Sequence, residues 1–452
     1  MVVSCPNGHD YEFNIEVDKK IVKPTETITF KVSKCTGHLD VSKIICYVNG
    51  VEQAEKGSSF SLKTDNSEKR YTVIADACLS NGTIKIGVSV DCYATNNSDL
   101  INCIYEYIDE WNYKPAISVS VLGNNVSYNY FGGYASLSSK SINTAETPHI
   151  LYSITKSFTA TSILKLKKEG KLELSDRLDK YVTGLSDIYV NNDATIEELL
   201  THRSGIADYT NNALLFTSNP FQNGSWDAKK ILDFIEYPAV DRGTFKYSSA
   251  NYIILGLIVE QVSGKSLNEY IRENFLTPLG LTELKLLPQD TTDYTKLTHP
   301  HAYPGTFMGI VGDGINPIDI NDIISDANEM LAKCGWAAGG MIGTASLVTK
   351  WGYNLLSPNG SIDLDIKENI TDSLSEFTES DSPSIAYGIA TRKLYHNGKA
   401  FIGSYGRSIG DENLMFYNPD KDVCITILTS SNTRKDGNPN IDELMYAIYD
   451  AL

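Results

Sequence analysis

The sequence has no long apolar run, no basic run and no glycine-rich loop of the phosphate-binding kind. Its longest apolar stretch, residues 252–259, is far shorter than the roughly 20 residues that cross a bilayer, so we expect no membrane span. Acidic residues outnumber basic ones by 56 to 39, and the formal net charge is −17. This charge repels polyanions, so nucleic acid and anionic membranes are poor candidate partners. Without a phosphate loop we also expect no nucleotide cofactor.

No export signal is visible at the start of the sequence, because Met1-Val-Val-Ser-Cys5 has neither a basic start nor an apolar core. A chain that begins after signal cleavage would look the same, so the compartment stays open. Cysteine is scarce in most of the chain, but six of the eight fall in the first 103 residues: Cys5, Cys35, Cys46, Cys78, Cys92 and Cys103. This clustering predicts disulfides in a small β domain, without selecting a pairing, and favours an extracytoplasmic or secreted location. The alternative is a zinc site, for which the loosely spaced ligands would be Cys5, His9, Cys35 and His38.

Length and composition indicate a folded protein of two or three domains. The chain has 452 residues, of which 42% are hydrophobic and 21% charged, and these are ordinary globular values. Residues 1–95 alternate apolar and polar side chains, as at Ile28, Phe30 and Val32 and again over residues 84–90. Turn signals Asn49-Gly50 and Asn81-Gly82 separate the runs. Short strands with one buried face predict a β-sandwich over residues 1–95, which resembles immunoglobulin-like accessory domains.

The pattern changes after a polar stretch at residues 94–99, and we expect a second domain over residues 99–452 in which helices alternate with strands. Two strands at 117–122 and 126–131 predict a hairpin. One helix is predicted from Ser153 to Gly170 and another from Asn251 to Gly264, each closed by its glycine.

Ser153 and Lys156 are three residues apart at the start of the first predicted helix, so their side chains lie on one face. A serine hydroxyl needs a base to become a nucleophile, and a neutral lysine amine within hydrogen-bond reach can serve. The helix N-terminus also directs backbone N–H groups to where an acyl-transfer oxyanion would form. The same spacing recurs at Ser162 and Lys165, but Ser162 lies in mid-helix and is interpreted as structural.

The neighbouring motifs resemble the serine β-lactamase and penicillin-binding-protein superfamily, in particular its esterase, D-peptidase and carboxypeptidase-like branch. The resemblance begins near Leu100 and extends to the end of the chain. Its blocks occur in family order: Ile117-Ser-Val-Ser-Val121, Gly132-Gly-Tyr-Ala135, Ser153-Ile-Thr-Lys-Ser-Phe-Thr-Ala160, Glu169-Gly-Lys-Leu-Glu-Leu-Ser-Asp176, Leu200-Thr-His-Arg-Ser-Gly205, Tyr247-Ser-Ser-Ala-Asn-Tyr252, Pro278-Leu-Gly-Leu281, Ala338-Gly-Gly-Met341, Thr344-Ala345 and Asn418-Pro-Asp-Lys-Asp422. The resemblance implies an α+β fold, an antiparallel sheet flanked by helices, with Ser153 and Lys156 as catalytic residues.

The resemblance also implies a Tyr-x-Asn element, whose tyrosine shares proton transfer with the lysine and whose asparagine holds the substrate amide. The matching positions are Tyr247, Ser248 and Ser249. We therefore expect a catalytic Tyr247 and, because serine replaces the asparagine, an altered substrate contact at Ser249.

A third family element is a Lys- or His-x-Gly strand that lines the site, and it falls on Ser404-Tyr405-Gly406. Gly406 keeps the glycine that lets a strand approach a ligand. The amides of Ser153 and Arg407 are the expected oxyanion donors. Ser404 replaces the cation that helps relatives to bind a carboxylate, which counts against β-lactams and free D-Ala-D-Ala ends. Arg407 either restores a cation there or is solvent-exposed.

The histidines give weaker signals. His202 lies in a block that is structural in relatives, and a lone histidine is more often packed than catalytic. His299 and His301 have no third ligand at useful spacing, so no metal site is expected. No candidate is found for the deacylating glutamate that some β-lactamases use.

The sequence therefore predicts a serine hydrolase that forms an acyl-enzyme on an amide or ester of a small molecule or peptide. D-amino-acid peptides, cell-wall fragments and small esters all fit as substrates. Two alternatives stay open: an acyltransferase or cyclase in which an amine replaces water, and a binding or scaffold protein that kept the fold and lost the activity. The oligomeric state is not predicted.

Overall fold

The structure is a computed structural model that divides into two compact units. It describes residues 2–4, 10–34, 41–48, 51–53, 59–65, 69–79, 84–94, 98–110, 115–123, 125–212, 214–217, 226–302, 318–324, 326–376, 378–379, 382–408, 410–431 and 441–452. Unit 1 is Met1–Tyr107 with Ala447–Leu452, and unit 2 is Ile108–Tyr446. The change of unit falls inside helix α1 (Ser98–Glu110). The domain ranges 1–95 and 99–452 stay a prediction.

Unit 1 contains two β-sheets. The first has the order β1 (Val2–Ser4), β2 (Asp10–Val17), β4 (Thr27–Lys34) and β7 (Ser59–Lys63). The second has the order β3 (Ile21–Val22), β9 (Ile84–Ala94), β8 (Lys69–Leu79), β5 (Val41–Val48) and β6 (Val51–Glu52). Neighbouring strands are antiparallel except for the parallel pair β3 and β9.

The two sheets of unit 1 share one core. The alternation at Ile28, Phe30 and Val32 buries these side chains against others that include Cys46 and Val73 of the second sheet. The rings of Phe30 and Phe60 stack with centroids 4.9 Å apart. This shared core confirms the small all-β sandwich, whereas its immunoglobulin-like character stays a prediction.

The predictions for the cysteines of unit 1 can be compared with the structure only where the residues are described. Cys103 is a free thiol on α1, and its sulfur lies 3.2 Å from the Leu100 carbonyl oxygen, to which it donates. The expectation that all six clustered cysteines form disulfides is therefore wrong for Cys103, whose place in a helix turn gives its S–H a backbone acceptor. The predicted zinc ligands Cys5, His9, Cys35 and His38 lie outside the described residues, as do the Asn-Gly turns at 49–50 and 81–82.

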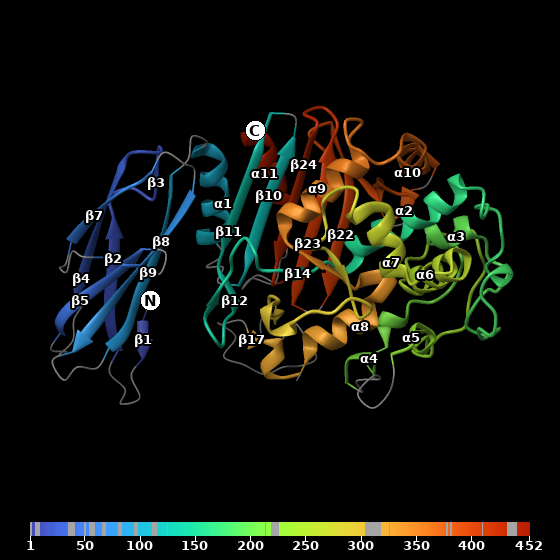
Figure 1. The fold of residues 1–452 in the computed structure, drawn as a ribbon, viewed down its shortest axis with the longest axis horizontal. Coiled ribbons are helices and arrows are strands. Elements are labelled where there is room, and N and C mark those ends of the chain that lie inside the picture. The colour runs from blue at the N-terminus through green and yellow to red at the C-terminus, as the bar shows by residue number, and fades with distance from the viewer. Residues whose placement is uncertain are drawn as a thin grey trace. The chain divides into compact units, whose positions relative to one another are not determined.

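The centre of unit 2 is an eight-stranded antiparallel sheet (Figure 1). Its order is β11 (Ser127–Gly132), β10 (Ile117–Gly123), β24 (Val423–Thr429), β23 (Asp411–Asn418), β22 (Lys399–Ser408), β21 (Arg392–His396), β20 (Ser382–Tyr387) and β19 (Thr378–Glu379). The predicted hairpin is the pair β10 and β11, with Ile117 opposite Gly132. The α+β fold with an antiparallel sheet is confirmed.

Helices cover both faces of this sheet. Helix α9 (Ala345–Leu356) packs on β10, β23 and β24. Helix α11 (Ile441–Ala451) meets the other face, where the Tyr446 ring contacts Phe401 and Tyr405 donates to Asp442. Side chains of β22 therefore alternate between α11 and the helical lobe.

The helical lobe beside the sheet contains the other α-helices of unit 2: α2 (Thr155–Lys168), α3 (Ile196–Leu200), α4 (Leu214–Thr217), α5 (Ala228–Leu232), α6 (Ala250–Ser263), α7 (Leu267–Ile271), α8 (Ala327–Gly339) and α10 (Leu364–Glu376). Three small sheets connect it to the rest: β12 (Tyr134–Ser136) with β13 (Ser141–Ile142), β14 (His149–Ile150) with β18 (Met341–Gly343) and β15 (Lys285–Leu286), and β16 (His301–Ala302) with β17 (Ile318–Asp319).

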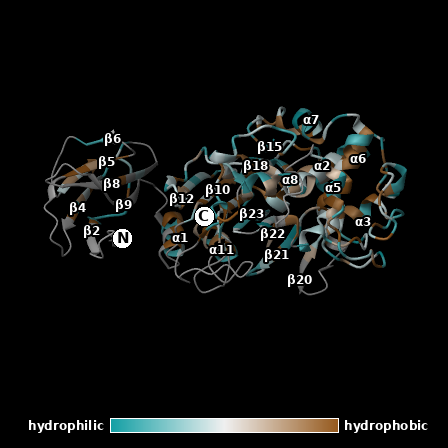
Figure 2. Cartoon of the chain, turned by 90° about the horizontal axis from the view of Figure 1, so that it is seen from below, coloured by the Kyte–Doolittle hydropathy of each residue, from teal (hydrophilic) through white to brown (hydrophobic). Residues whose placement is uncertain are grey.

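Helices α2 and α6 are central to the lobe, and the apolar colouring of α6 in Figure 2 matches its buried position. Eleven of the fourteen residues of α2 are buried, including five with hydroxyl groups. Both predicted helices end as expected, with Gly170 at φ 68° and Gly264 at φ 70°. The first differs at its start, because Ser153 lies in a 3₁₀ turn, η1 (Tyr152–Ile154), just before α2. No helix in the described ranges is long and apolar enough to cross a membrane.

Candidate active site

The predicted nucleophile and base are in contact. The η1 turn holds Ser153, half-buried, above the first turn of α2, and Lys156 Nζ lies 2.9 Å from Ser153 Oγ. The lysine side chain is only 1% exposed. This burial keeps bulk water from the amine, and its hydrogen bonds go to protein oxygens.

Tyr247 completes the pair from a distant part of the chain. Its phenol donates to Ser153 Oγ at 2.8 Å. Two residues later, Ser249 precedes α6 and its Oγ lies 3.4 Å from Lys156 Nζ. Ser153, Lys156, Tyr247 and Ser249 therefore converge, as the sequence predicts.

Lys156 has a further hydrogen-bond acceptor that the sequence did not predict. Its Nζ donates to the carbonyl oxygen of Ala338 at 2.9 Å. This carbonyl follows a kink in α8, where Trp336 has φ 31° and ψ −120°. A non-glycine residue with these backbone angles is strained, and packing of the buried Trp336 side chain offsets the cost. A backbone carbonyl has no signature in the sequence.

The His202 ring packs against the Tyr247 ring. The two rings lie 4.2 Å apart, and His202 Nδ1 accepts a hydrogen bond from the backbone N–H of Ser248 at 3.1 Å. The other ring nitrogen, Nε2, lies 3.0 Å from the Tyr387 phenol. Burial, and then the charge of Lys156, hold the pKa of His202 well below its ordinary value. The imidazole is thus neutral and packed, in agreement with its interpretation as a structural residue.

Tyr152 fixes the turn that carries Ser153. It has φ 45°, in the left-handed region. Its buried phenol donates to Asp411 Oδ2 at 2.5 Å, at the start of β23. Burial raises the pKa of Asp411 well above its ordinary value. This bond ties the nucleophile turn to the central sheet.

Gly406 brings strand β22 against the same turn. A Cβ at this position would lie 2.1 Å from the Leu151 carbonyl oxygen, so only glycine fits. Ser404 lies on the same face of β22, is buried, and does not border the cavity beside Ser153. Its predicted role in substrate binding stays a prediction.

The side chain of Arg407 lies with the α11 face of the sheet. Its guanidinium pairs with Glu412 Oε1 at 2.6 Å and stacks 4.8 Å from the centroid of the Tyr405 ring. Tyr405 in turn donates to Asp442 at 2.6 Å. Burial raises the pKa of both Glu412 and Asp442, and Arg407 opposes this rise. The guanidinium is therefore engaged by a carboxylate of the protein.

A cavity of about 310 Å³ opens beside Ser153. Tyr247, Ser249 and Arg407 line it. The sequence analysis missed the other lining residues, which come from separate segments and follow no common motif: Tyr152, Asp208, Tyr209, Thr210, Leu215, Leu331, Cys334, Gly335, Ala338, Gly339 and Ser408. The cavity is small and partly apolar, so it suits a short acyl group.

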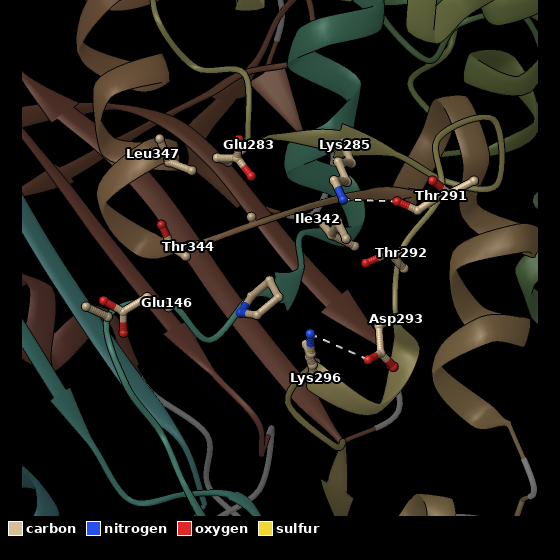
Figure 3. Close-up of a pocket in the computed structure, with 13 residues that line it drawn as sticks. Glu146, Glu283, Lys285, Thr291, Thr292, Asp293, Lys296, Ile342, Thr344 and Leu347 are labelled. Atoms are coloured by element: carbon tan, nitrogen blue, oxygen red, sulfur yellow. Dashed lines mark hydrogen bonds and ion pairs between the residues drawn. The ribbon is translucent and has the colours of Figure 1, made fainter.

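A second groove of about 740 Å³ is lined in part by Ile342 and Gly343 of strand β18 (Figure 3). Lys285, Lys296, Glu146 and Asp293 are among its mostly exposed lining residues, and Lys285 donates to the Thr291 carbonyl oxygen at 3.0 Å. It is larger than the cavity at Ser153 but contains none of Ser153, Lys156 and Tyr247. We therefore assign the chemistry to the smaller cavity.

His299 and His301 form a structural cluster with Asp319. His299 Nδ1 lies 2.8 Å from Asp319 Oδ2, which also accepts from Ser136 at 3.0 Å. Among the described residues, no group of three or more His, Cys, Asp or Glu side chains could hold a metal ion. Ser162, the other serine with a lysine three residues later, donates to the Phe158 carbonyl oxygen at 2.9 Å, as its structural interpretation requires.

Comparison with known proteins agrees with this geometry. The beta-lactamase family model matches residues 111–447. Protein flp of Staphylococcus aureus (strain COL) is 33% identical over 193 residues, which are 42% of this chain and 38% of flp. Penicillin-binding protein 4* of Bacillus subtilis (strain 168) is 26% identical over 204 residues, 42% of each chain. The match thus spans about two-fifths of the length of these curated relatives.

Solved structures share the fold of most of this chain. The D-amino acid amidase from Ochrobactrum anthropi SV3, complexed with L-phenylalanine amide, superimposes with a TM-score of 0.66 at 20% identity. The match covers 78% of this chain and 98% of the amidase. Since the family model covers most of the chain, the chain belongs to the beta-lactamase family.

Proposed function

We propose that the protein is a serine hydrolase that cleaves an amide or ester bond through an acyl-enzyme on Ser153. The observation that carries this proposal is the contact of three groups: Ser153 Oγ lies 2.9 Å from Lys156 Nζ and 2.8 Å from Tyr247 Oη. A serine hydroxyl next to an amine and a phenol has the proton acceptor that nucleophilic catalysis needs.

The reaction proceeds in two steps. Ser153 Oγ attacks the substrate carbonyl carbon, and its proton passes through Lys156 and Tyr247 to the leaving amine or alcohol as the C–N or C–O bond breaks. Water then attacks the ester on Ser153 and gives its proton back to Ser153 Oγ through the same two groups. Positioned proton transfer of this kind contributes about 10²–10⁴ in rate.

The backbone amides of Ser153 and Arg407 stabilise the oxyanion in both steps. Both residues border the cavity. Because the Arg407 side chain turns to Tyr405 and Glu412, its backbone is the part that serves the reaction. Each donor of this kind is worth about 10²–10³ in rate.

The substrates that fit are D-amino-acid peptides or amides, cell-wall fragments and small esters. A cavity of about 310 Å³ supports a short acyl group, and the fold is shared with a D-amino acid amidase. Ser404 supplies no cation, which disfavours β-lactams and peptides that end in D-Ala-D-Ala. The departures at Ser249 and Ser404 also motivate the scaffold alternative, but the intact Ser153–Lys156–Tyr247 contact favours an enzyme.

An acylating probe tests the proposal directly. We expect a fluorophosphonate or activated ester to add one acyl or phosphonyl group per chain, measured by intact mass, and Ser153→Ala to abolish both the adduct and the turnover of a neutral p-nitrophenyl ester. Ser162→Ala is the matched control, because this serine also precedes a lysine by three residues but bonds to its own helix. An adduct of equal yield on Ser153→Ala would refute the assignment.

The acceptor of the acyl group is tested by product analysis. We expect the free acid as the product in water, and added amine to change its yield little if the protein is a hydrolase. A dominant amide product at millimolar amine would favour the transferase alternative.

A further inference from the structure

The charges around the cavity point to the kind of substrate that it binds. In the part of the chain that the structure describes, two charged residues line the cavity, Asp208 and Arg407. Their availability to a ligand differs, and this difference determines the sign of the charge that the cavity attracts.

The guanidinium of Arg407 is already paired. It lies 2.6 Å from Glu412 Oε1 and over the Tyr405 ring, on the face of β22 opposite to Gly406. Glu412 is almost fully buried, so separating the pair would leave a buried carboxylate without its cation. A substrate carboxylate would therefore have to share a guanidinium that already pairs with Glu412, although the Arg407 side chain is 53% exposed.

Asp208 is the opposite case. Its Oδ1 accepts a hydrogen bond from the backbone N–H of Thr210 at 3.1 Å. Among the described residues, its Oδ2 accepts no hydrogen bond, and no lysine or arginine pairs with it. The cavity thus contains a carboxylate with an unused oxygen and without a counter-ion from the described chain.

The neighbours of Asp208 hold it next to the reacting groups. The Ala207 carbonyl oxygen accepts from Ser248 Oγ at 3.1 Å, and Ser248 lies between Tyr247 and Ser249. On the other side, the buried Tyr209 phenol donates to the Cys334 carbonyl oxygen at 2.7 Å. With both flanking residues bonded, the backbone at Asp208 is held at the wall of the cavity that Tyr247 also lines, and this limits the entropy lost on binding.

We propose that the acyl portion of the substrate carries an ammonium group that pairs with Asp208, and so that Asp208 determines specificity at the Ser153 site. This inference rests on the proposed function. Leu215, Leu331 and Ala338 line the same cavity, so the substrate class is a short amide or ester with a small apolar side chain and a free amino group, such as an amino-acid amide. The net charge of −17 adds long-range attraction for such a cation.

A matched set of p-nitroanilides tests the inference. The alanyl compound, in both enantiomers, carries the ammonium group, the isobutyryl compound replaces it with a methyl group, and the succinyl compound carries a carboxylate. We expect kcat/KM to be highest for an alanyl enantiomer and lowest for the succinyl compound. In Asp208→Asn the alanyl-to-isobutyryl ratio falls by about tenfold, the effect of one partly exposed charge pair.

Asp208→Asn removes the charge with little other change, and the chain offers a matched control. Asparagine caps a helix as well as aspartate does, so Asp208→Asn keeps the bond to Thr210 and removes the charge. The control is Asp227→Asn, because Asp227 caps α5 through a similar bond to Lys229 N at 2.9 Å but lies outside the cavity. We expect the control to keep the substrate ratio of the native protein, and 0.5 M NaCl to lower the ratio only where Asp208 is present.

The outcomes separate this inference from the proposed function. The inference is overturned if the alanyl-to-isobutyryl ratio of kcat/KM is unchanged in Asp208→Asn, or if the protein prefers the succinyl compound. The proposed function still holds in that case, provided that ester hydrolysis depends on Ser153. If no compound is turned over, calorimetry measures binding to Ser153→Ala instead. The cation site is supported if alaninamide binds about tenfold more tightly than isobutyramide and if the added substitution Asp208→Asn removes this preference. Equal affinities overturn it.

Discussion

At the scale of single residues, Tyr247 serves two neighbours with different parts of its side chain. The phenol donates to Ser153 Oγ, while the ring packs on the neutral imidazole of His202 at 4.2 Å. The imidazole is in turn bonded by Ser248 N and the Tyr387 phenol. Because the ring is held independently of the hydroxyl, the two contributions can be separated by mutation.

Tyr247→Phe removes only the hydroxyl that contacts Ser153. We expect kcat for a test ester to fall by about 10²–10⁴, since one of the two proton-transfer groups is lost. The midpoint of thermal unfolding should change little, because the ring keeps its packing on His202. Rates of probe acylation, followed by intact mass, measure the effect on the first step.

Tyr252→Phe is the control for this experiment. Tyr252 lies near the same lysine, with its ring centroid 5.6 Å from Lys156 Nζ, but its phenol donates to the Leu200 carbonyl oxygen at 2.8 Å. It should cost about 1 kcal/mol of stability and leave the acylation rate within a few-fold. Equal losses of activity in the two variants would contradict a proton-transfer role for Tyr247.

The candidate site divides by how each residue could be recognised. Ser153 and Lys156 follow from spacing on a helix, and Tyr247 follows from the order of family motifs. The carbonyl of Ala338 and the carboxylate of Asp208 could not be predicted in this way. The first is a backbone atom presented by a kink at Trp336, and the second belongs to a residue that borders the cavity only because segments distant in sequence pack together.

At the scale of elements, strand β22 separates two environments. Its odd residues Phe401, Tyr405 and Arg407 meet α11 and the carboxylates near it, while Gly406 faces the Ser153 turn. Alternation along the strand therefore directs the Arg407 side chain to the face opposite Gly406, where it pairs with Glu412. The sequence located this strand but could not orient it, because that requires knowing which face α11 covers.

Gly406→Ala tests how closely the strand must approach the nucleophile. The new methyl group would lie 2.1 Å from the Leu151 carbonyl oxygen, so β22 or the η1 turn must shift. A displacement of about 1 Å at a reacting group can cost 10²-fold in rate, and we expect a loss of this size in kcat/KM. Circular dichroism should confirm that the secondary structure is retained.

Ile402→Val provides the comparison on the same strand. Ile402 lies on the face of Gly406 and packs against the main core. We expect a loss of about 0.5–1.5 kcal/mol in stability and little loss of activity. Comparable activity losses in both variants would indicate a general effect of strand stability and not the close approach at Gly406.

At the scale of the whole molecule, buried histidines make stability depend on pH. Among the described residues of unit 2, two of the buried histidines, His149 in β14 and His202, have a pKa that burial lowers. Burial lowers the pKa of His149 to about 3 and holds that of His202 well below its ordinary value. In the unfolded chain both titrate near pH 6.5, about the value of a free histidine. Acid therefore favours the unfolded state, because these two histidines bind protons there and stay neutral in the native state.

The sign and size follow from proton linkage. Between about pH 6.5 and pH 3 the unfolded state binds one more proton at His149 than the native state, so the free energy of unfolding falls as the pH is lowered. The slope is about 1.4 kcal/mol per pH unit for each such histidine. Above about pH 6.5 both states are neutral at these positions, and the contribution is constant.

His149→Gln removes one of the two buried histidines whose pKa is lowered in the native state. His149 Nε2 lies 3.1 Å from Ser118 Oγ and Nδ1 lies 3.2 Å from Thr298 Oγ1, and glutamine cannot keep both contacts, so we expect a loss of about 1–3 kcal/mol at pH 8. Below pH 6 the variant should lose stability less steeply than the native protein, by about 1.4 kcal/mol per pH unit. Urea unfolding at pH 8, 7, 6 and 5, followed by tryptophan fluorescence, measures this, because the sequence ranges of unit 1 contain no tryptophan. Parallel pH profiles for the two proteins would mean that His149 takes up its proton in the folded state, against the burial seen here.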